Sequence, residues 1–184
     1  MKNLIKITTV FALIISVNTN AQETDVLNNR EVSEFTELQS QVNTEVIIIK
    51  STRNNILIQG SEEAQKDLLI QEQEGRLAIS FQSETIENQL TRIVIETTGF
   101  NSLISGGIGN YFVIGLDQKN FVLMNPAAKV SLSGTLDNIY LTSLSGHTDL
   151  SKLSTENEWV ELSETASYVE SKFSGRNLIA KKAE

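Results

Sequence analysis

Apolar residues in this chain are gathered into short segments that small or polar residues separate. Within Arg76–Phe81, for example, Leu77, Ile79 and Phe81 alternate with less apolar neighbours, which is the period of a half-buried β-strand. Similar segments predict strands at Glu45–Lys50, Ile56–Gln59, Leu68–Gln73 and Arg92–Thr97. Ser61–Asp67 is the exception, because Ser61 followed by acidic residues predicts a single helical turn with Ser61 as its N-cap.

From residue 100 onwards, strands end in small or polar corners at a nearly constant interval. The corners begin at Ser105, Asn125, Ser143 and Ser163, so they step by 20, 18 and 20 residues. Strands are predicted before the corners at Asn101–Ser105, Asn120–Asn125, Asn138–Ser143 and Glu158–Ser163, and between them at Tyr111–Ile114, Lys129–Ser133, His147–Leu150 and Ser167–Glu170. A strand-and-turn unit repeating at this period favours an all-β β-solenoid. An antiparallel sandwich is the alternative, although it needs no fixed interval.

These patterns divide the chain into four parts. Residues 1–21 are predicted to be a signal peptide and residues 22–34 a flexible lead-in. Residues 35–99 are predicted to form an irregular N-terminal β layer. Residues 100–180 contain the repeats, and we expect them to form one continuous domain with residues 35–99.

The N-terminus has the three parts of a secretory signal. Lys2 and Lys6 precede the apolar run Ile7–Val17, and the small residues Thr19 and Ala21 mark a cleavage site. The run is shorter than the roughly 20 apolar residues that a membrane-spanning helix needs. We therefore expect an exported protein, in the periplasm, on the outer surface or outside the cell, that does not span a membrane after the signal is removed.

Composition excludes several classes of chemistry and of partner. The chain has no cysteine, which excludes disulfides, thiolate metal sites and thiol catalysis. Its formal net charge of −8 and the lack of a basic patch argue against a nucleic acid partner. The acidic residues are scattered along the sequence, as is typical of a solvated surface.

The order of the segments carries a family resemblance. Its elements are Arg30–Phe35, the strand ending at Lys50, Ile56–Gly60, Leu68–Ile79, and the corners at Leu103–Gly107, Ser133-Gly134 and Ser145-Gly146. Over roughly residues 30–172, this order resembles the putative auto-transporter adhesin, head GIN domain family, a domain of unknown function common in exported Bacteroidetes proteins. The resemblance implies right-handed β-helix-like repeats and no known enzymatic activity. The chain departs from the family at Asn125-Pro126 and Ser163-Glu164, which replace Gly-Ser pairs, and in its C-terminal ending.

Candidate reactive groups are few. His147 is the only histidine and lies between Ser145 and Asp149, but these residues would be about 6–7 Å apart along a strand and no oxyanion donors accompany them. One histidine without cysteine argues against zinc, and no calcium-loop motif is present. Gly106–Gly109 looks like a phosphate loop but lacks the lysine and is followed by a strand, which favours a sharp corner. We expect no catalytic residue, no cofactor and no metal site.

Three functional hypotheses remain open. Phe121, Tyr140 and Trp159 occupy near-equivalent places in successive repeats. Facing outward they would form a ladder that stacks against a ligand, and facing inward they would be core, which we prefer because exposed apolar area is unfavourable. The leading hypothesis is an exported, non-enzymatic binding or adhesion module for a glycan or an envelope protein. The alternative is a structural envelope protein that forms homo-oligomers through the solenoid ends. The third is a small glycan-acting enzyme that uses an acid pair such as Glu72 and Glu74.

Overall fold

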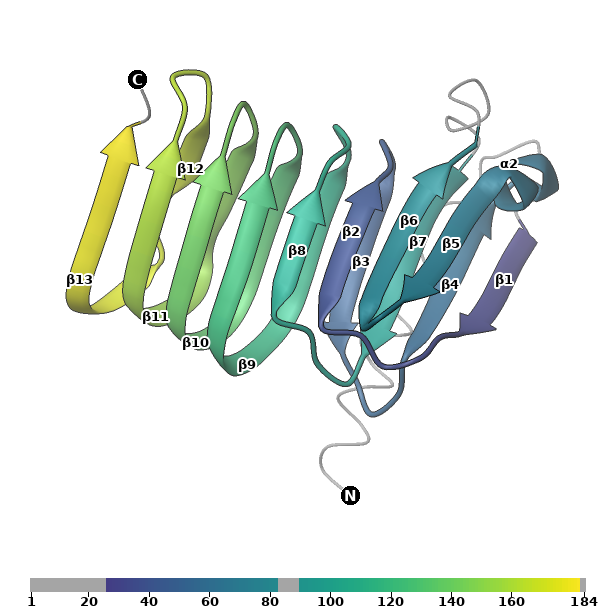
Figure 1. Cartoon of the computed structure of the whole chain (residues 1–184), viewed down its shortest axis with the longest axis horizontal. Coiled ribbons are helices and arrows are strands. Elements are labelled where there is room, and N and C mark those ends of the chain that lie inside the picture. Colours follow the sequence, from purple (N-terminus) through teal and green to yellow (C-terminus); the bar gives the residue numbers. More distant parts are fainter. Residues whose placement is uncertain (1–25, 83–89, 183–184) are drawn as a thin grey trace.

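The protein is all-β, with one short helix among the described residues (Figure 1). The computed structural model describes residues 26–82 and 90–182, so the predicted signal peptide lies outside the described residues. The strands are β1 (Val26–Glu31), β2 (Glu37–Gln41), β3 (Glu45–Lys50), β4 (Asn55–Gly60), β5 (Leu68–Gln73), β6 (Arg76–Phe81), β7 (Leu90–Thr97), β8 (Ser102–Ser105), β9 (Asn110–Asn125), β10 (Lys129–Ser143), β11 (His147–Leu162), β12 (Ser167–Val169) and β13 (Lys172–Lys182). Helix α2 (Glu62–Asp67) lies between β4 and β5.

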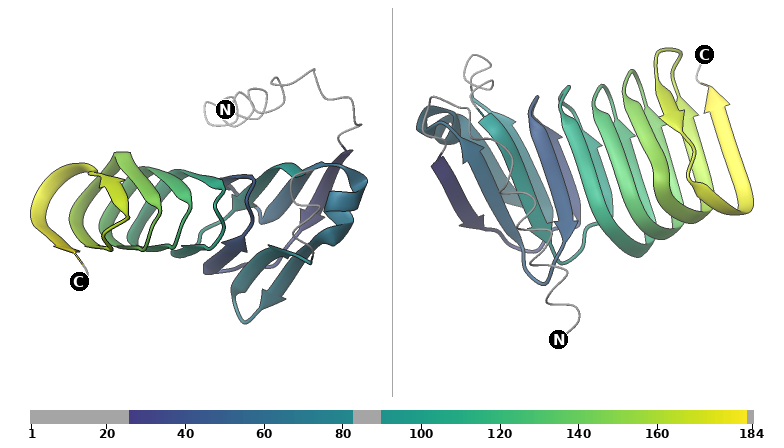
Figure 2. Two further views of the ribbon diagram at one scale, coloured as in Figure 1. Left: turned by 90° about the horizontal axis from the view of Figure 1, so that it is seen from above. Right: turned by 180° about the vertical axis from the view of Figure 1, so that it is seen from behind.

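The strands form one 13-stranded sheet that curls over itself (Figure 2). The curl arises because β9 takes part in two pairings. Its residues 110–114 pair with β3, and its residues 122–124 pair with β8. We call the side containing β1, β4, β7, β3, β12 and the first parts of β9–β11 the first face. The side containing β5, β6, β2, β8, β13 and the second parts of β9–β11 is the second face.

The C-terminal half is a parallel, in-register stack of β9, β10, β11 and β13. The predicted strands on either side of each interval are thus continuous: Tyr111–Ile114 and Asn120–Asn125, for instance, are both in β9. The register shifts where β10 bends, between Leu132 and Gly134. Gly134 has φ +132°, and a Cβ there would lie 2.1 Å from the Leu116 carbonyl oxygen, so the bend requires glycine.

The core lies between the two faces, and the corners add a buried polar column to it. Alternate residues of each strand point inward, so fully buried apolar side chains from both faces meet in one cluster. At the corners, Ser105 Oγ donates to Asn125 Oδ1 at 3.1 Å, and Ser143 Oγ donates to the Asn125 carbonyl at 3.0 Å. Asn125 Nδ2 in turn donates to Thr148 Oγ1 at 3.0 Å. The predicted corners thus join successive strands by burying partnered polar groups.

A second polar column lies on the outer surface of the second face. Asn138 Nδ2 donates to Asn120 Oδ1 at 2.7 Å, and Asn157 Nδ2 donates to Asn138 Oδ1 at 2.8 Å. The asparagines are register partners in adjacent strands. This amide ladder ties β9, β10 and β11 together beside their bend.

The N-terminal half differs from the sequence expectation in three ways. Residues 22–34 were expected to be a flexible lead-in, but Val26–Glu31 is strand β1, paired antiparallel with β4. Strand β2 was not predicted, because Glu37–Gln41 is too polar to stand out by pattern. β3 and β4 do not pair with each other, since β7 lies between them. The β5–β6 hairpin is confirmed, with a turn at Glu74 and Gly75, both at positive φ.

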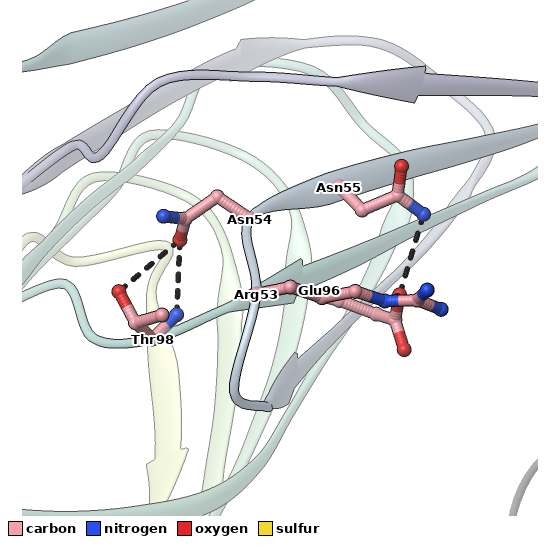
Figure 3. A network of polar contacts seen from close by, with 5 residues as sticks. All are labelled: Arg53, Asn54, Asn55, Glu96 and Thr98. Atoms are coloured by element: carbon pink, nitrogen blue, oxygen red, sulfur yellow. Dashed lines mark hydrogen bonds and ion pairs between the residues drawn. The ribbon is translucent and has the colours of Figure 1, made fainter.

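The turn between β3 and β4 is fastened to the end of β7 by polar contacts (Figure 3). Glu96 is buried, and its Oε2 accepts from Arg53 Nε at 2.7 Å and from Asn55 Nδ2 at 3.3 Å. The Glu96 carboxylate raises the pKa of Arg53 through its hydrogen bond and its charge. Asn54 Oδ1 accepts from the Thr98 amide at 2.9 Å.

The predicted helical turn is confirmed as α2. The Ser61 hydroxyl accepts from the Ala64 amide at 3.2 Å, which satisfies one of the free donors at the helix N-terminus. Ala64 is buried, and the helix lies at the end of the stack opposite β13 (Figure 1).

Candidate binding face

The outer surface of the second face carries a row of exposed apolar and aromatic side chains. Val122, Tyr140 and Trp159 are register partners in β9, β10 and β11, so they form one row across the strands. Val122 is 39% exposed and Tyr140 is 43% exposed. Met124 lies two residues beyond Val122 in β9, is 45% exposed, and is the register partner of Ile104 in β8. These five residues, which we call the aromatic row, are held by parallel strands with no loop between them.

Tyr140 and Trp159 stack on each other. Their ring centroids are 4.6 Å apart and their planes differ by 7°. The spacing is close to that between neighbouring strands, so each ring covers one face of the other. A pair stacked across strands in this way presents ring edges and aliphatic neighbours outward, rather than one broad open ring face.

Phe121 does not belong to this row. It is fully buried, and its ring meets Phe100 edge to face, with centroids 5.3 Å apart. Its register partner in β10 is Ile139, not Tyr140. A difference of one residue in a strand turns a side chain to the opposite face, so the three aromatics are divided between core and surface. The missing signal was the register, which the spacing of the corners does not resolve.

The histidine motif is separated into unrelated contacts. His147 Nδ1 is 2.9 Å from Ser167 Oγ on the neighbouring strand, and Asp149 Oδ1 accepts from the Ser151 amide at 2.9 Å. The hydrogen bonds from Ser151 lower the pKa of Asp149. Ser145 Oγ donates to the Pro126 carbonyl at 2.8 Å. The serine, the histidine and the acid therefore do not form a relay.

The glycine-rich segment is a tight corner. A Cβ on Gly107 would lie 2.1 Å from the Val42 carbonyl oxygen, so this backbone packs against a neighbouring backbone. The Ile108 amide donates to Asn43 Oδ1 at 2.8 Å, and the Ile108 side chain is exposed. The segment spends its amide on the protein itself, and β9 follows it.

The acid pairs lie apart from any groove shaped for chemistry. Glu72 accepts from the Ser33 amide at 2.8 Å and lies 3.6 Å from Arg30, and the Ser33 hydrogen bonds lower the pKa of Glu72. A hollow of about 140 Å³ beside it is lined mainly by β5, β6 and the turn joining them. Within residues 26–82 and 90–182, no group of three or more histidine or acidic side chains is arranged to hold a metal ion. No helix in this part of the chain is long and apolar enough to cross a membrane.

Similarity to known proteins is found in the fold. Neither a protein-family model nor a curated protein matches the sequence. A crystal structure described as a putative adhesin from Parabacteroides distasonis has a TM-score of 0.69 at 13% identity, covering 88% of this chain and 79% of that one. One described as a putative adhesin from Parabacteroides merdae has a TM-score of 0.64 at 11% identity, covering 78% of this chain. This chain spans only 62% of the length of the latter protein.

A third structure widens the range of names attached to this fold. It is described as a putative lipid binding protein from Parabacteroides distasonis, and it has a TM-score of 0.54 at 10% identity, covering 89% of this chain and 98% of that one. At such identities the likeness concerns the fold alone. The names of these neighbours indicate binding modules, and they specify no common ligand.

Proposed function

We propose that this protein is an exported, non-enzymatic binding module of the cell envelope that uses the aromatic row as its recognition face. The carrying observation is an exposed apolar surface, centred on the stacked Tyr140–Trp159 pair, on a stack of paired strands. Exposed apolar clusters of this kind mark interaction sites in soluble proteins. Tyrosine and tryptophan are also the residues enriched at binding hot spots.

The proposal includes the architecture and the location. Parallel in-register pairing of β9, β10, β11 and β13 supports a β-solenoid with right-handed rungs, as the resemblance to the head GIN domain family implies. The apolar N-terminal run supports secretion by a cleaved signal peptide. Fold neighbours described as adhesins agree with a surface or exported location.

The geometry favours a protein ligand over a sugar ring. A sugar stacks on an open aromatic face, whereas each ring of this pair already covers one face of the other. Aliphatic Val122, Met124 and Ile104 extend the surface along the stack and suit the apolar side chains of a partner protein. We therefore propose an envelope protein as the partner, with glycans as the competing outcome.

The test is binding of the purified protein to fractionated envelope proteins and to a glycan array, with three alanine variants. We expect Trp159→Ala and Tyr140→Ala each to weaken binding to a protein fraction by about 30-fold, the effect of losing a hot-spot side chain. Phe112→Ala is the matched control, because Phe112 is an exposed aromatic on the first face. Binding that Phe112→Ala abolishes and Trp159→Ala leaves unchanged would move the site to the other face. Saturable glycan binding would replace the protein ligand, and no binding at all would refute the proposed function.

A further inference from the structure

The two ends of the strand stack carry opposite charge. At one end, residues 62–74, which include α2 and β5, contain five acidic residues and one lysine. At the other end, β13 contains three lysines, one arginine and no acidic residue. Figure 1 shows β13 and α2 at opposite extremes of the molecule. The charge is therefore separated along the direction in which the strands stack.

The basic end is also an open edge. Within residues 26–82 and 90–182, β13 pairs only with β11, so its other side is an unpaired strand edge of 11 residues. Such edges are templates for pairing with another chain, and lysines on them commonly block association of like edges. The same lysines attract an edge of opposite charge.

The acidic end presents carboxylates to solvent. Glu62, Glu63 and Glu74 are all exposed, and the only ion pair printed among them is the surface contact of Glu62 with Lys66 at 3.6 Å. The chain covers part of the β5 edge itself, since Arg30 Nη2 donates to the Ile70 carbonyl at 3.4 Å. Contacts at this end therefore depend mainly on the exposed carboxylates of α2 and of the β5–β6 turn.

Strand direction is compatible with joining the two ends. β6, β2, β8, β9, β10, β11 and β13 all run parallel, and β5 runs antiparallel to β6. A second copy displaced along the stack would set its β5 antiparallel to β13 of the first, on the same face. Antiparallel strands are the more stable pairing per residue.

We propose that the protein assembles head to tail, with the basic β13 edge of one copy docking on the acidic α2–β5 end of the next. The partner is a second copy of this chain, and the surfaces are the two opposite ends, not the aromatic row. Because the contact is heterologous, each copy keeps one free end and the assembly extends as a chain. Because the attraction lies between solvent-exposed charges, raised salt weakens it.

The test is the mass of the purified protein by sedimentation velocity, at low ionic strength and over a range of concentrations. Two double variants each neutralise one end. Lys172→Glu with Lys182→Glu changes β13, and Glu63→Lys with Glu74→Lys changes the acidic end. We expect each double variant to weaken association by about tenfold or more, although the two shift net charge in opposite directions. Lys129→Glu with Lys152→Glu, exposed residues of inner strands, is the matched control and keeps association unchanged.

Mixing the two double variants gives the sharpest result. Each variant retains one intact end, so the mixture should form dimers and no longer chains. Urea unfolding of each variant checks that the fold is retained. Wild-type protein that stays monomeric at every concentration would overturn the proposal. So would association that follows net charge, or a mixture that remains monomeric.

Discussion

The inward-facing carboxyl of Glu158 gives a sharp test of how this core is built. Glu158 is 1% exposed and is the register partner of Ile139, which in turn is the partner of Phe121. A column of apolar core residues thus continues into an acid. Its Oε2 accepts from Ser171 Oγ at 2.7 Å, whereas Oε1 has no partner among the described residues.

Burial raises the pKa of Glu158, with the Ser171 hydrogen bonds opposing the shift and the charge of Glu170 adding to it. Folding therefore favours the protonated carboxyl. The contribution of this group to stability is fully present below the ordinary glutamate pKa of 4.5 and is lost as the pH rises through the raised pKa of the folded protein. At neutral pH the folded protein carries the cost of a buried, half-satisfied charge.

We expect Glu158→Leu to be more stable than the wild type at pH 7 by about 1–3 kcal/mol, the cost of one unsatisfied buried polar group. The leucine continues the apolar column, and the half-buried Ser171 can turn to water. Glu158→Gln removes only the ionisation and isolates the pH-dependent part. For both variants, the gain over the wild type should shrink as the pH falls towards 4.5, where the wild-type carboxyl is protonated.

The assay is urea unfolding from pH 4 to pH 8, with wild-type values subtracted so that other titrating groups cancel. Glu156→Gln is the matched control, because Glu156 lies on the same strand and is exposed. It should follow the wild type at every pH. A Glu158→Gln difference that does not vary with pH, or that grows towards acid, would refute the argument that the folded protein holds this carboxyl protonated.

Two further predictions concern backbone packing and the amide ladder. Gly107→Ala should destabilise the protein by about 1–3 kcal/mol or more in urea unfolding, because the new Cβ would lie 2.1 Å from the Val42 carbonyl oxygen. Gly99→Ala, with open space around it, should be close to neutral, and equal effects would contradict the packing argument. Asn138→Ala removes the middle of the ladder and should cost about 1–2 kcal/mol, while Asn110→Ala, an exposed asparagine outside the ladder, should cost much less.

Much of the local structure could be predicted from the sequence. The bounds of β3, β5 and β6 agree with the alternating segments, and Ser61 caps α2 as its residue type indicates. These features depend on near neighbours in the chain, since alternation and capping are properties of a few consecutive residues. β1 was missed because an edge strand with exposed side chains has little apolar pattern.

The candidate site was only partly accessible in this way. Tyr140 and Trp159 were correctly grouped, and Phe121 was placed with them because the corners suggested a uniform spacing. In the structure, β9 and β10 are offset by 18 residues at this level, which pairs Phe121 with Ile139. The buried acid at Glu158 gave no sequence signal either, because charge alone does not show which way a strand residue faces.

The sequence by itself determined that this protein is built from short strands joined by small polar corners, without cysteine chemistry and without a recognisable catalytic motif. The tertiary structure alone decided which strands are neighbours, which aromatics reach the surface and where the charges gather. The physical reason is that side chains alternate between the two sides of a strand. A shift of one residue in pairing therefore exchanges core for surface, and only packing across the whole sheet fixes that register.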